Sequence, residues 1–289
     1  MNFSNIQSVL SDEERRLLSR ADELKSRAAG GASAFSGFLS PREIYILTAF
    51  GHETKVKRSE LASEDQISFF WGGYPDAERK IFISIPGFSA YSLPDSDTET
   101  YSPAELSTLV DDLDRHITSV FIKSSGYVGL SHRDYMGALL GLGIERDHVG
   151  DIVLVDNDAV VFAEPKIADF IRSTLVEVGR DKVKICEVPE NVTLSRSFEP
   201  ISGTVASARL DSVVSELVKT SRETAKELIR RGFVEHNYFE AADADVPVTS
   251  GDVISVRRDG RVRGGKFIID RADELTGKGR VRVIARKYS

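Results

Sequence analysis

Two short amphipathic helices are predicted within RLDSVVSELVKTSRETAKELIRRGFVEHN, residues 209–237, and this pair constrains the fold more than any other feature. Apolar residues recur on one face of each helix: Val213, Val214, Leu217 and Val218 in the first, and Ala225, Leu228 and Ile229 in the second. We expect Thr220 to cap the second helix in a capping box with Glu223. Gly232 follows, where helices commonly end in a left-handed backbone.

Basic side chains are expected on the outer face of the same pair. Arg222, Lys226 and Arg230 are spaced by four residues, so they rise about 6 Å per step, which suits successive phosphates. Lys219 and Arg231 flank this row. The alternative is a solvated helix face whose cations pair with nearby glutamates. We expect Arg222 and Arg230 to point outward.

The charge of the chain is divided unevenly between its two ends. The formal net charge is -7, yet residues 200–289 hold 17 Lys and Arg against 13 Asp and Glu, a net of +4. Residues 1–199 carry a net of -11. This asymmetry indicates a polyanionic partner for the C-terminal part.

Composition excludes several classes of protein. Hydrophobic residues make up 41% and charged residues 29%, as in soluble globular proteins. The single cysteine, Cys186, allows no intrachain disulfide, indicates a reducing compartment, and is expected to be a buried strand residue. The N-terminus lacks a secretory signal pattern, and no run of about 18 apolar residues could span a membrane. We therefore expect a cytosolic protein.

The N-terminal segment reads as two helices followed by two strands. The first helix begins at Ser11 or Asp12 and ends near Gly30, and the second begins at Ser40 with Pro41 in its first turn. Strands are predicted for QISFFWGG and IFISIP. The polar stretch SLPDSDTETYSP is a loop or linker.

The order of elements in the central segment predicts a β-α-β-β-α-β arrangement, which is ferredoxin-like and shared by RNA-recognition modules. The elements are ITSVFIKS, SHRDYMGALLGLG with Ser131 as its cap, the hairpin DIVLVDNDAVVFAE, KIADFIRSTLVEVG and KVKICEV. The third strand, AVVFAE, lacks the aromatic signature with which these modules stack bases. A scaffold or protein-docking role is therefore favoured for this segment.

Motifs for catalysis and metal binding are incomplete. GRVRGGK at 260–266 has the spacing of a phosphate-binding loop, but Phe267 stands where Ser or Thr would bind magnesium. Arg261, Arg263 and Lys266 instead form a basic hairpin, either near phosphates or simply solvated. The HRD triplet beginning at His132 has no accompanying kinase motifs. Five His and one Cys show no clustered metal-ligand spacing, so we expect no metal and no cofactor.

The helical pair and its continuation resemble the S4 RNA-binding domain. The matching residues are Arg209, Leu210, Asp211, Leu217, Ser221, Arg222, Ala225, Leu228, Ile229, Gly232 and Val234, followed by Gly251 and Asp252. The family usually has V-N-G where this chain has His236-Asn237-Tyr238, so the turn glycine is lost. A helix-turn-helix DNA binder is the competing interpretation, and the β-rich continuation argues against it.

Over most of its length the chain resembles the YlmH family. SHRDYMGALLGLGIERDHVGDIVL is similar to that family's H-R-D to G-D-I stretch, with Met136 in place of a leucine, and PREIYILTAF and WGGYPDAERK are similar to its N-terminal elements. The resemblance implies a non-enzymatic protein of bacterial ribosome-associated quality control. It would bind a stalled 50S subunit that carries peptidyl-tRNA while the nascent chain receives an alanine tail. Family genes also lie near cell-division genes.

The expected fold is therefore α+β in three domains: an N-terminal α/β domain at 1–95, a ferredoxin-like (RRM-like) domain at 100–190 and an S4 domain at 200–289 with basic C-terminal strands. The expected partners are 23S rRNA, tRNA or peptidyl-tRNA and quality-control factors, without a membrane. Predicted RNA contacts are Arg209, Lys219, Ser221, Arg222, Lys226, Arg230, Arg231, Asn237, Arg257, Arg258, Arg261 and Arg263, with accessory contacts at His132, Arg133 and Arg146. Two alternatives stay open: an RNA-modifying enzyme of pseudouridine-synthase type, and an RNA-binding factor of cell division.

Overall fold

The computed structural model describes residues 9–54, 58–61, 63–92, 100–110, 113–189, 192, 194–260, 262–277 and 279–288. The predicted contact residue Arg261 lies outside these ranges. The chain divides into two compact units, residues 2–195 and residues 196–289. Several helices and separate antiparallel sheets confirm the predicted α+β class. None of the described helices has the length and apolar character needed to cross a membrane.

Local capping signals set the first two helices. Helix α2 (Asp12–Ala29) begins at Ser11, whose side chain accepts a hydrogen bond from the Glu14 amide while Glu14 reaches back to the Ser11 amide. Helix α3 (Pro41–Ala49) begins at Ser40 in the same way, with Glu43 as the reciprocal partner. Both predicted helix starts are confirmed.

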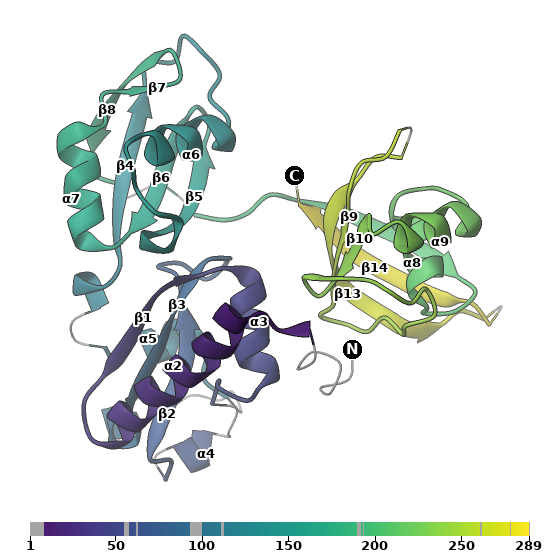
Figure 1. The fold of residues 1–289 in the computed structure, drawn as a ribbon, viewed down its shortest axis with the longest axis horizontal. Coiled ribbons are helices and arrows are strands. Elements are labelled where there is room, and N and C mark those ends of the chain that lie inside the picture. Colours follow the sequence, from purple (N-terminus) through teal and green to yellow (C-terminus); the bar gives the residue numbers. More distant parts are fainter. Residues whose placement is uncertain are drawn as a thin grey trace. The chain divides into compact units, whose positions relative to one another are not determined.

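The N-terminal helices accompany a three-stranded antiparallel sheet with the order β1-β3-β2 (Figure 1). Its strands are β1 (Ala34–Leu39), β2 (Gln66–Trp71) and β3 (Lys80–Pro86). Sequence analysis predicted β2 and β3 and missed β1. Helix α2 packs its buried Ala21 and Leu24 against Phe70 and Phe82 of the sheet. The short helical segment α4 (Arg58–Leu61) precedes β2, and η1 (Gly87–Ser92), α5 (Pro103–Ser107) and η2 (Leu113–Arg115) follow β3.

The central sheet is antiparallel with the order β5-β6-β4-β8-β7. In chain order the elements are β4 (Thr118–Ser124), α6 (His132–Gly141), η3 (Arg146–His148), β5 (Val149–Val155), β6 (Asp158–Ala163), α7 (Pro165–Thr174), β7 (Glu177–Val178) and β8 (Asp181–Cys186). The β5–β6 hairpin turns at Asp156, whose φ is 55°. Cys186 does lie at the end of a strand, but it is exposed, so its predicted burial is wrong.

The two faces of the central sheet are both occupied by apolar packing. Helices α6 and α7 cover one face, where Val120 and Val161 are buried. Phe121, Val160 and Phe162 point to the other face and belong to one cluster with residues of the N-terminal sheet. RNA-recognition sheets stack bases on their helix-free face. In this protein Phe121, Val160 and Phe162 on that face are buried in a core, so bases cannot stack on them.

Asp151 fixes the contact between the N-terminal and central parts of this unit. The carboxylate is 5% exposed and accepts hydrogen bonds from the Tyr74 hydroxyl at 2.7 Å and from the Glu78 and Arg79 amides at 2.8 and 3.1 Å. The guanidinium of Arg79 donates to the carbonyl oxygens of Phe38, Arg146 and Val149. Tyr74 and Arg79 belong to WGGYPDAERK and Asp151 to the G-D-I stretch, so these three residues have a structural role here.

The unit of residues 196–289 consists of two helices on a six-stranded antiparallel sheet with the order β11-β10-β12-β13-β14-β9. The helices are α8 (Leu210–Leu217) and α9 (Arg222–Arg230). The strands are β9 (Phe198–Val205), β10 (Val234–His236), β11 (Phe239–Glu240), β12 (Val253–Val256), β13 (Gly265–Leu275) and β14 (Val281–Tyr288). Strand β9, at one edge of the sheet, contains Pro200 and was not predicted from the sequence.

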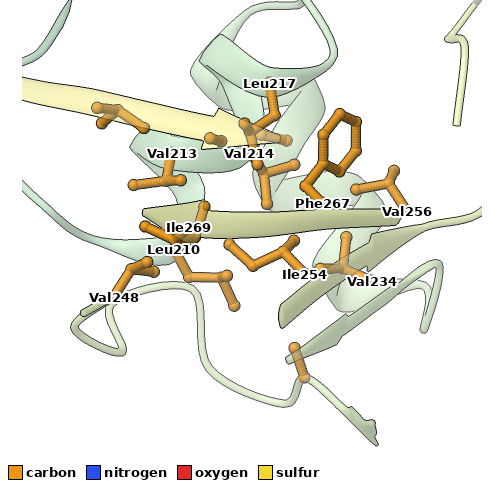
Figure 2. Packing of buried hydrophobic residues seen from close by; sticks show 14 of the residues in the cluster. Leu210, Val213, Val214, Leu217, Val234, Val248, Ile254, Val256, Phe267 and Ile269 are labelled. Carbon is orange, nitrogen blue, oxygen red and sulfur yellow. The ribbon is translucent and has the colours of Figure 1, made fainter. Parts of the chain in front are cut away.

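The helical pair buries the predicted face. Figure 2 shows Val213, Val214 and Leu217 packed with Phe267 and Ile269 of the sheet, and Ala225, Leu228 and Ile229 belong to the same cluster. Gly232 adopts a φ of 71°, as predicted. The predicted cap is wrong by one residue: Ser221, not Thr220, accepts the hydrogen bond from the Thr224 amide. Lys219 before it has a φ of 52°, which delays the start of α9.

Candidate nucleic-acid interface

A groove beside the α8–α9 turn gathers cations from three elements of the C-terminal unit. Its volume is about 460 Å³, and its lining includes Lys219 after α8, Arg263 before β13 and Lys287 of β14. Leu217 and Phe267 form part of its floor. Arg263 and Lys219 are exposed. Two predicted contact residues are thus brought together, and Lys287, which sequence reasoning missed, joins them.

The outer face of α9 is basic but ion-paired. Arg230 lies 2.7 Å from Glu227, and Lys226 lies 3.7 Å from Glu223. The hydrogen bonds between Glu227 and Arg230 raise the pKa of the arginine and lower the pKa of the glutamate. The alternative interpretation, a solvated helix face, predicts ion pairs of this kind. Exposed pairs of this kind add little stability, so a phosphate can replace the glutamate at small cost.

The end of α9 is tied to the β12–β13 turn. Arg231 pairs with Asp259 of that turn at 2.6 Å, and its guanidinium carbon lies 4.6 Å from the centre of the Phe233 ring. Arg257 pairs with Glu235 at 3.2 Å. Arg258 is exposed on the same turn. We call the cations on and around α9 the α9 rim; they are Lys219, Lys226, Arg230, Arg231, Arg257, Arg258 and Arg263.

Arg222 is exposed, as predicted, but it also has an ion-pair partner that the sequence did not predict. Its Nη2 donates to Asp211 Oδ2 at 2.6 Å, and the Asp211 side chain is completely buried. The predicted outward direction of Arg222 therefore holds only in part, because its guanidinium also neutralises a buried carboxylate. Its guanidinium remains 45% exposed, but its main physical task is to neutralise a buried carboxylate.

Asn237 is also built into the protein rather than presented to a ligand. It is 6% exposed, its amide nitrogen donates to Asp252 at 2.8 Å and its oxygen accepts from the Val253 amide. Burial raises the pKa of Asp252, but the His236 ring, Asn237 and the Thr249 amide outweigh it and lower that pKa to about 2. The predicted contact role of Asn237 does not fit this position, and we leave it out of the α9 rim.

The remaining predicted contacts are dispersed. Arg209 is exposed and pairs with Asp245 at 2.9 Å, and Ser221 serves as the cap of α9. His132 and Arg133 are exposed at the start of α6, where Ser131 is the cap residue as predicted. Arg146 belongs to η3, where its Nη1 lies 2.7 Å from the Met136 sulfur. These last three residues belong to the unit of residues 2–195.

One group of potential metal ligands was not anticipated. Glu145, Asp147 and His148 hold ligand atoms within 4.8 Å of one another around η3. His148 Nδ1 also lies 3.0 Å from Glu164. Sequence reasoning missed the group because it searched His and Cys spacing and not carboxylates beside a histidine. Exposed acidic groups commonly cluster without an ion, and the group carries no assignment.

Part of the chain matches the model of a known family. Residues 114–191 match the family model described as "Putative RNA-binding domain in YlmH". The predicted resemblance to the YlmH family is confirmed. The match covers the central sheet and its helices, the segment for which the sequence favoured a scaffold or docking role.

Individual relatives extend this similarity. The chain is 28% identical over 230 residues to "Ribosome-associated protein quality control protein P2" of Bacillus subtilis (strain 168), covering 78% of this chain and 77% of that protein. Among solved structures it is similar to "Cell division protein ylmH from Streptococcus pneumoniae", with 19% identity and a TM-score of 0.43, covering 64% of this chain and 97% of that one.

Proposed function

We propose that the protein is a non-enzymatic RNA-binding factor of ribosome-associated quality control. In this proposal the α9 rim binds 23S rRNA of the large ribosomal subunit and the peptidyl-tRNA that a stalled subunit carries. The protein acts in the cytoplasm on the ribosome, together with the factors that add C-terminal alanine to the stalled chain.

The observation that carries the proposal is the set of cations on α9 and the β12–β13 turn, two of which, Lys219 and Arg263, line one groove. Lys219 and Arg263 line the groove, and the Arg231–Asp259 pair joins the end of α9 to the turn that carries Arg258. Phosphate contacts from Lys and Arg supply most of the affinity for RNA without reading sequence. The quality-control relative supports a role on the ribosome, and the family model supports RNA binding by the protein, although it matches residues 114–191 and not the α9 rim.

Binding without catalysis is favoured over an RNA-modifying enzyme. A modifying enzyme needs a reactive group directed into a pocket that holds a base. Two described groups with shifted pKa values, Asp252 and Tyr135, instead serve hydrogen bonds within the fold. Nucleoside mass spectrometry of rRNA and tRNA incubated with the protein tests this choice, and any new modified nucleoside would favour the enzyme.

Co-sedimentation with purified 30S, 50S and 70S particles at 50 and 200 mM salt tests the proposal. We expect binding to 50S particles. If about six phosphates are engaged, affinity should fall on the order of a thousandfold between these salt concentrations. Binding that does not respond to salt would contradict an electrostatic interface.

The mutant for this assay is Lys226→Glu with Arg230→Glu, because both side chains are exposed and neither neutralises a buried group. The matched control is Arg16→Glu with Arg20→Glu on α2, which has the same charge change and the same four-residue spacing on an exposed helix face. The rim variant should lose 50S binding and the control should keep it. Equal losses would show only a dependence on total charge, and the rim would be the wrong surface.

A further inference from the structure

The C-terminal sheet has one open face. Cross-strand partners share a face of a sheet, so the register assigns each residue a side. Phe267, Ile269, Val283 and Ala285 are buried beneath α8 and α9. The alternating positions Lys266, Ile268, Ile284, Arg286 and Tyr288 are half-buried or exposed. The face opposite the helices is therefore open along β13 and β14.

Aromatic and cationic side chains gather at the β9 edge of this open face. Phe198 and Tyr288 are cross-strand partners whose ring centres lie 5.1 Å apart in an edge-to-face arrangement. The Lys266 ammonium lies 4.6 Å from the centre of the Tyr288 ring and 5.3 Å from that of Tyr238. The guanidinium of Arg286 lies 4.9 Å from the Phe198 ring centre.

A third cation reaches the same rings from outside the strands. The guanidinium of Arg196, two residues before β9, lies 5.8 Å from the Tyr288 ring centre. Asp270 pairs with Arg286 at 2.9 Å. We call this group the ring cluster; it consists of three aromatic rings, Phe198, Tyr238 and Tyr288, and three cations, Arg196, Lys266 and Arg286. Its rings are half-buried, and it carries more positive than negative charge.

We propose that the ring cluster is a second RNA site, which binds a single-stranded segment by stacking bases on Phe198 and Tyr288 and placing phosphates at Lys266, Arg286 and Arg196. This inference deepens the proposed RNA-binding function and rests on it. The site lies on the open face of the sheet, whereas the α9 rim belongs to the helices and to the β12–β13 turn.

The chemistry of the cluster selects single strands over duplexes. A duplex hides the faces of its bases, whereas a single strand can place them on aromatic rings and leave its phosphates to nearby cations. The cations flanking these rings complement a polyanion and disfavour a basic or purely apolar peptide. A sheet that presents half-exposed rings between cations is the arrangement that single-stranded RNA modules use on other folds.

Fluorescence anisotropy of a labelled 12-nucleotide oligouridylate with the full chain tests this site, beside a 12-base-pair RNA duplex. The Phe198→Ala/Tyr288→Ala variant should weaken single-strand binding by about tenfold or more, with little change in its salt dependence. Lys266→Gln should instead reduce the slope of log affinity against log salt by roughly 0.7. Tyr288→Phe keeps the ring and should keep the affinity. Tyr127→Ala, which removes an aromatic side chain that is 92% exposed on the other unit, is the control.

The outcomes separate this inference from the broader proposal. If the wild-type chain binds neither RNA nor 50S particles, the proposed function itself fails. If 50S binding depends on Lys226 and Arg230 while the alanine variant binds oligouridylate within twofold of wild type, only the ring cluster is refuted. The inference is also overturned if Tyr127→Ala weakens binding equally.

Discussion

Arg222→Ala should destabilise the C-terminal unit far more than the removal of any other cation on α9. Asp211 is fully buried, and its Oδ2 receives the Arg222 Nη2 at 2.6 Å, while Ser212 Oγ donates to Oδ1 at 3.1 Å. Without Arg222 the carboxylate keeps one hydroxyl donor and no opposite charge. Breaking a buried pair from one side costs about 3–5 kcal/mol, and the exposed half of Arg222 lowers this to about 2–4 kcal/mol.

Urea unfolding at neutral pH measures this cost, and the two units can be followed separately. The only tryptophan, Trp71, lies in β2 and reports residues 2–195 by fluorescence, whereas far-ultraviolet circular dichroism reports both units. The dichroism transition that has no fluorescence counterpart belongs to residues 196–289. Arg222→Ala should lower the midpoint of that transition and leave the Trp71 transition in place.

Two comparisons make the result decisive. Arg230→Ala removes an exposed cation paired with Glu227 and should leave the midpoint almost unchanged. Adding Asp211→Asn to Arg222→Ala removes the unpaired charge and should recover most of the lost stability. If Arg222→Ala and Arg230→Ala unfold at the same urea concentration, the burial of Asp211 does not impose the cost argued here.

Three further measurements test the fold of both units. Leu228→Ala, at a position 1% exposed in the C-terminal core, should cost about 2–5 kcal/mol in the same urea assay, and a smaller loss would show that the core collapses around the cavity. The fold lowers the pKa of Asp252 to about 2. The charged carboxylate therefore stabilises the protein fully above about pH 4, and this stabilisation is lost as pH falls toward 2. Asp252→Asn should flatten the plot of unfolding free energy against pH in that range. Gly73→Ala should destabilise residues 2–195 more than Gly31→Ala. Both glycines have a positive φ, so either substitution adds backbone strain of about 1–3 kcal/mol. Only the Gly73 substitution also places a Cβ 2.4 Å from the Phe162 ring. Equal thermal midpoints for the two variants would contradict that steric argument.

Local signals in the sequence predicted local structure well. The cap at Ser40, and one of the two caps considered for the first helix, Ser11, were predicted correctly because capping partners lie within one helical turn. The apolar face of α8 and α9 was also correct, since helical spacing alone determines which side chains point inward.

Features that depend on distant partners were missed. Strand β9 contains a proline and a glycine and looks like a linker until β14 pairs along its whole length. The role of Arg222 depends on Asp211, which lies eleven positions earlier and whose burial is decided by the whole helical pair. The ring cluster joins Phe198, Lys266 and Tyr288 through the register of three strands, and no single stretch of the sequence contains that pattern.

The edge strand β9 has a consequence for how copies of the protein behave when crowded. An unpaired strand edge can template the addition of a strand from another molecule and so begin fibril-like association. Pro200 removes one backbone donor from β9, and the charged Glu199 precedes it. The strand that carries Phe198 can therefore keep an aromatic side chain accessible while its backbone discourages edge-to-edge pairing with a strand of another molecule.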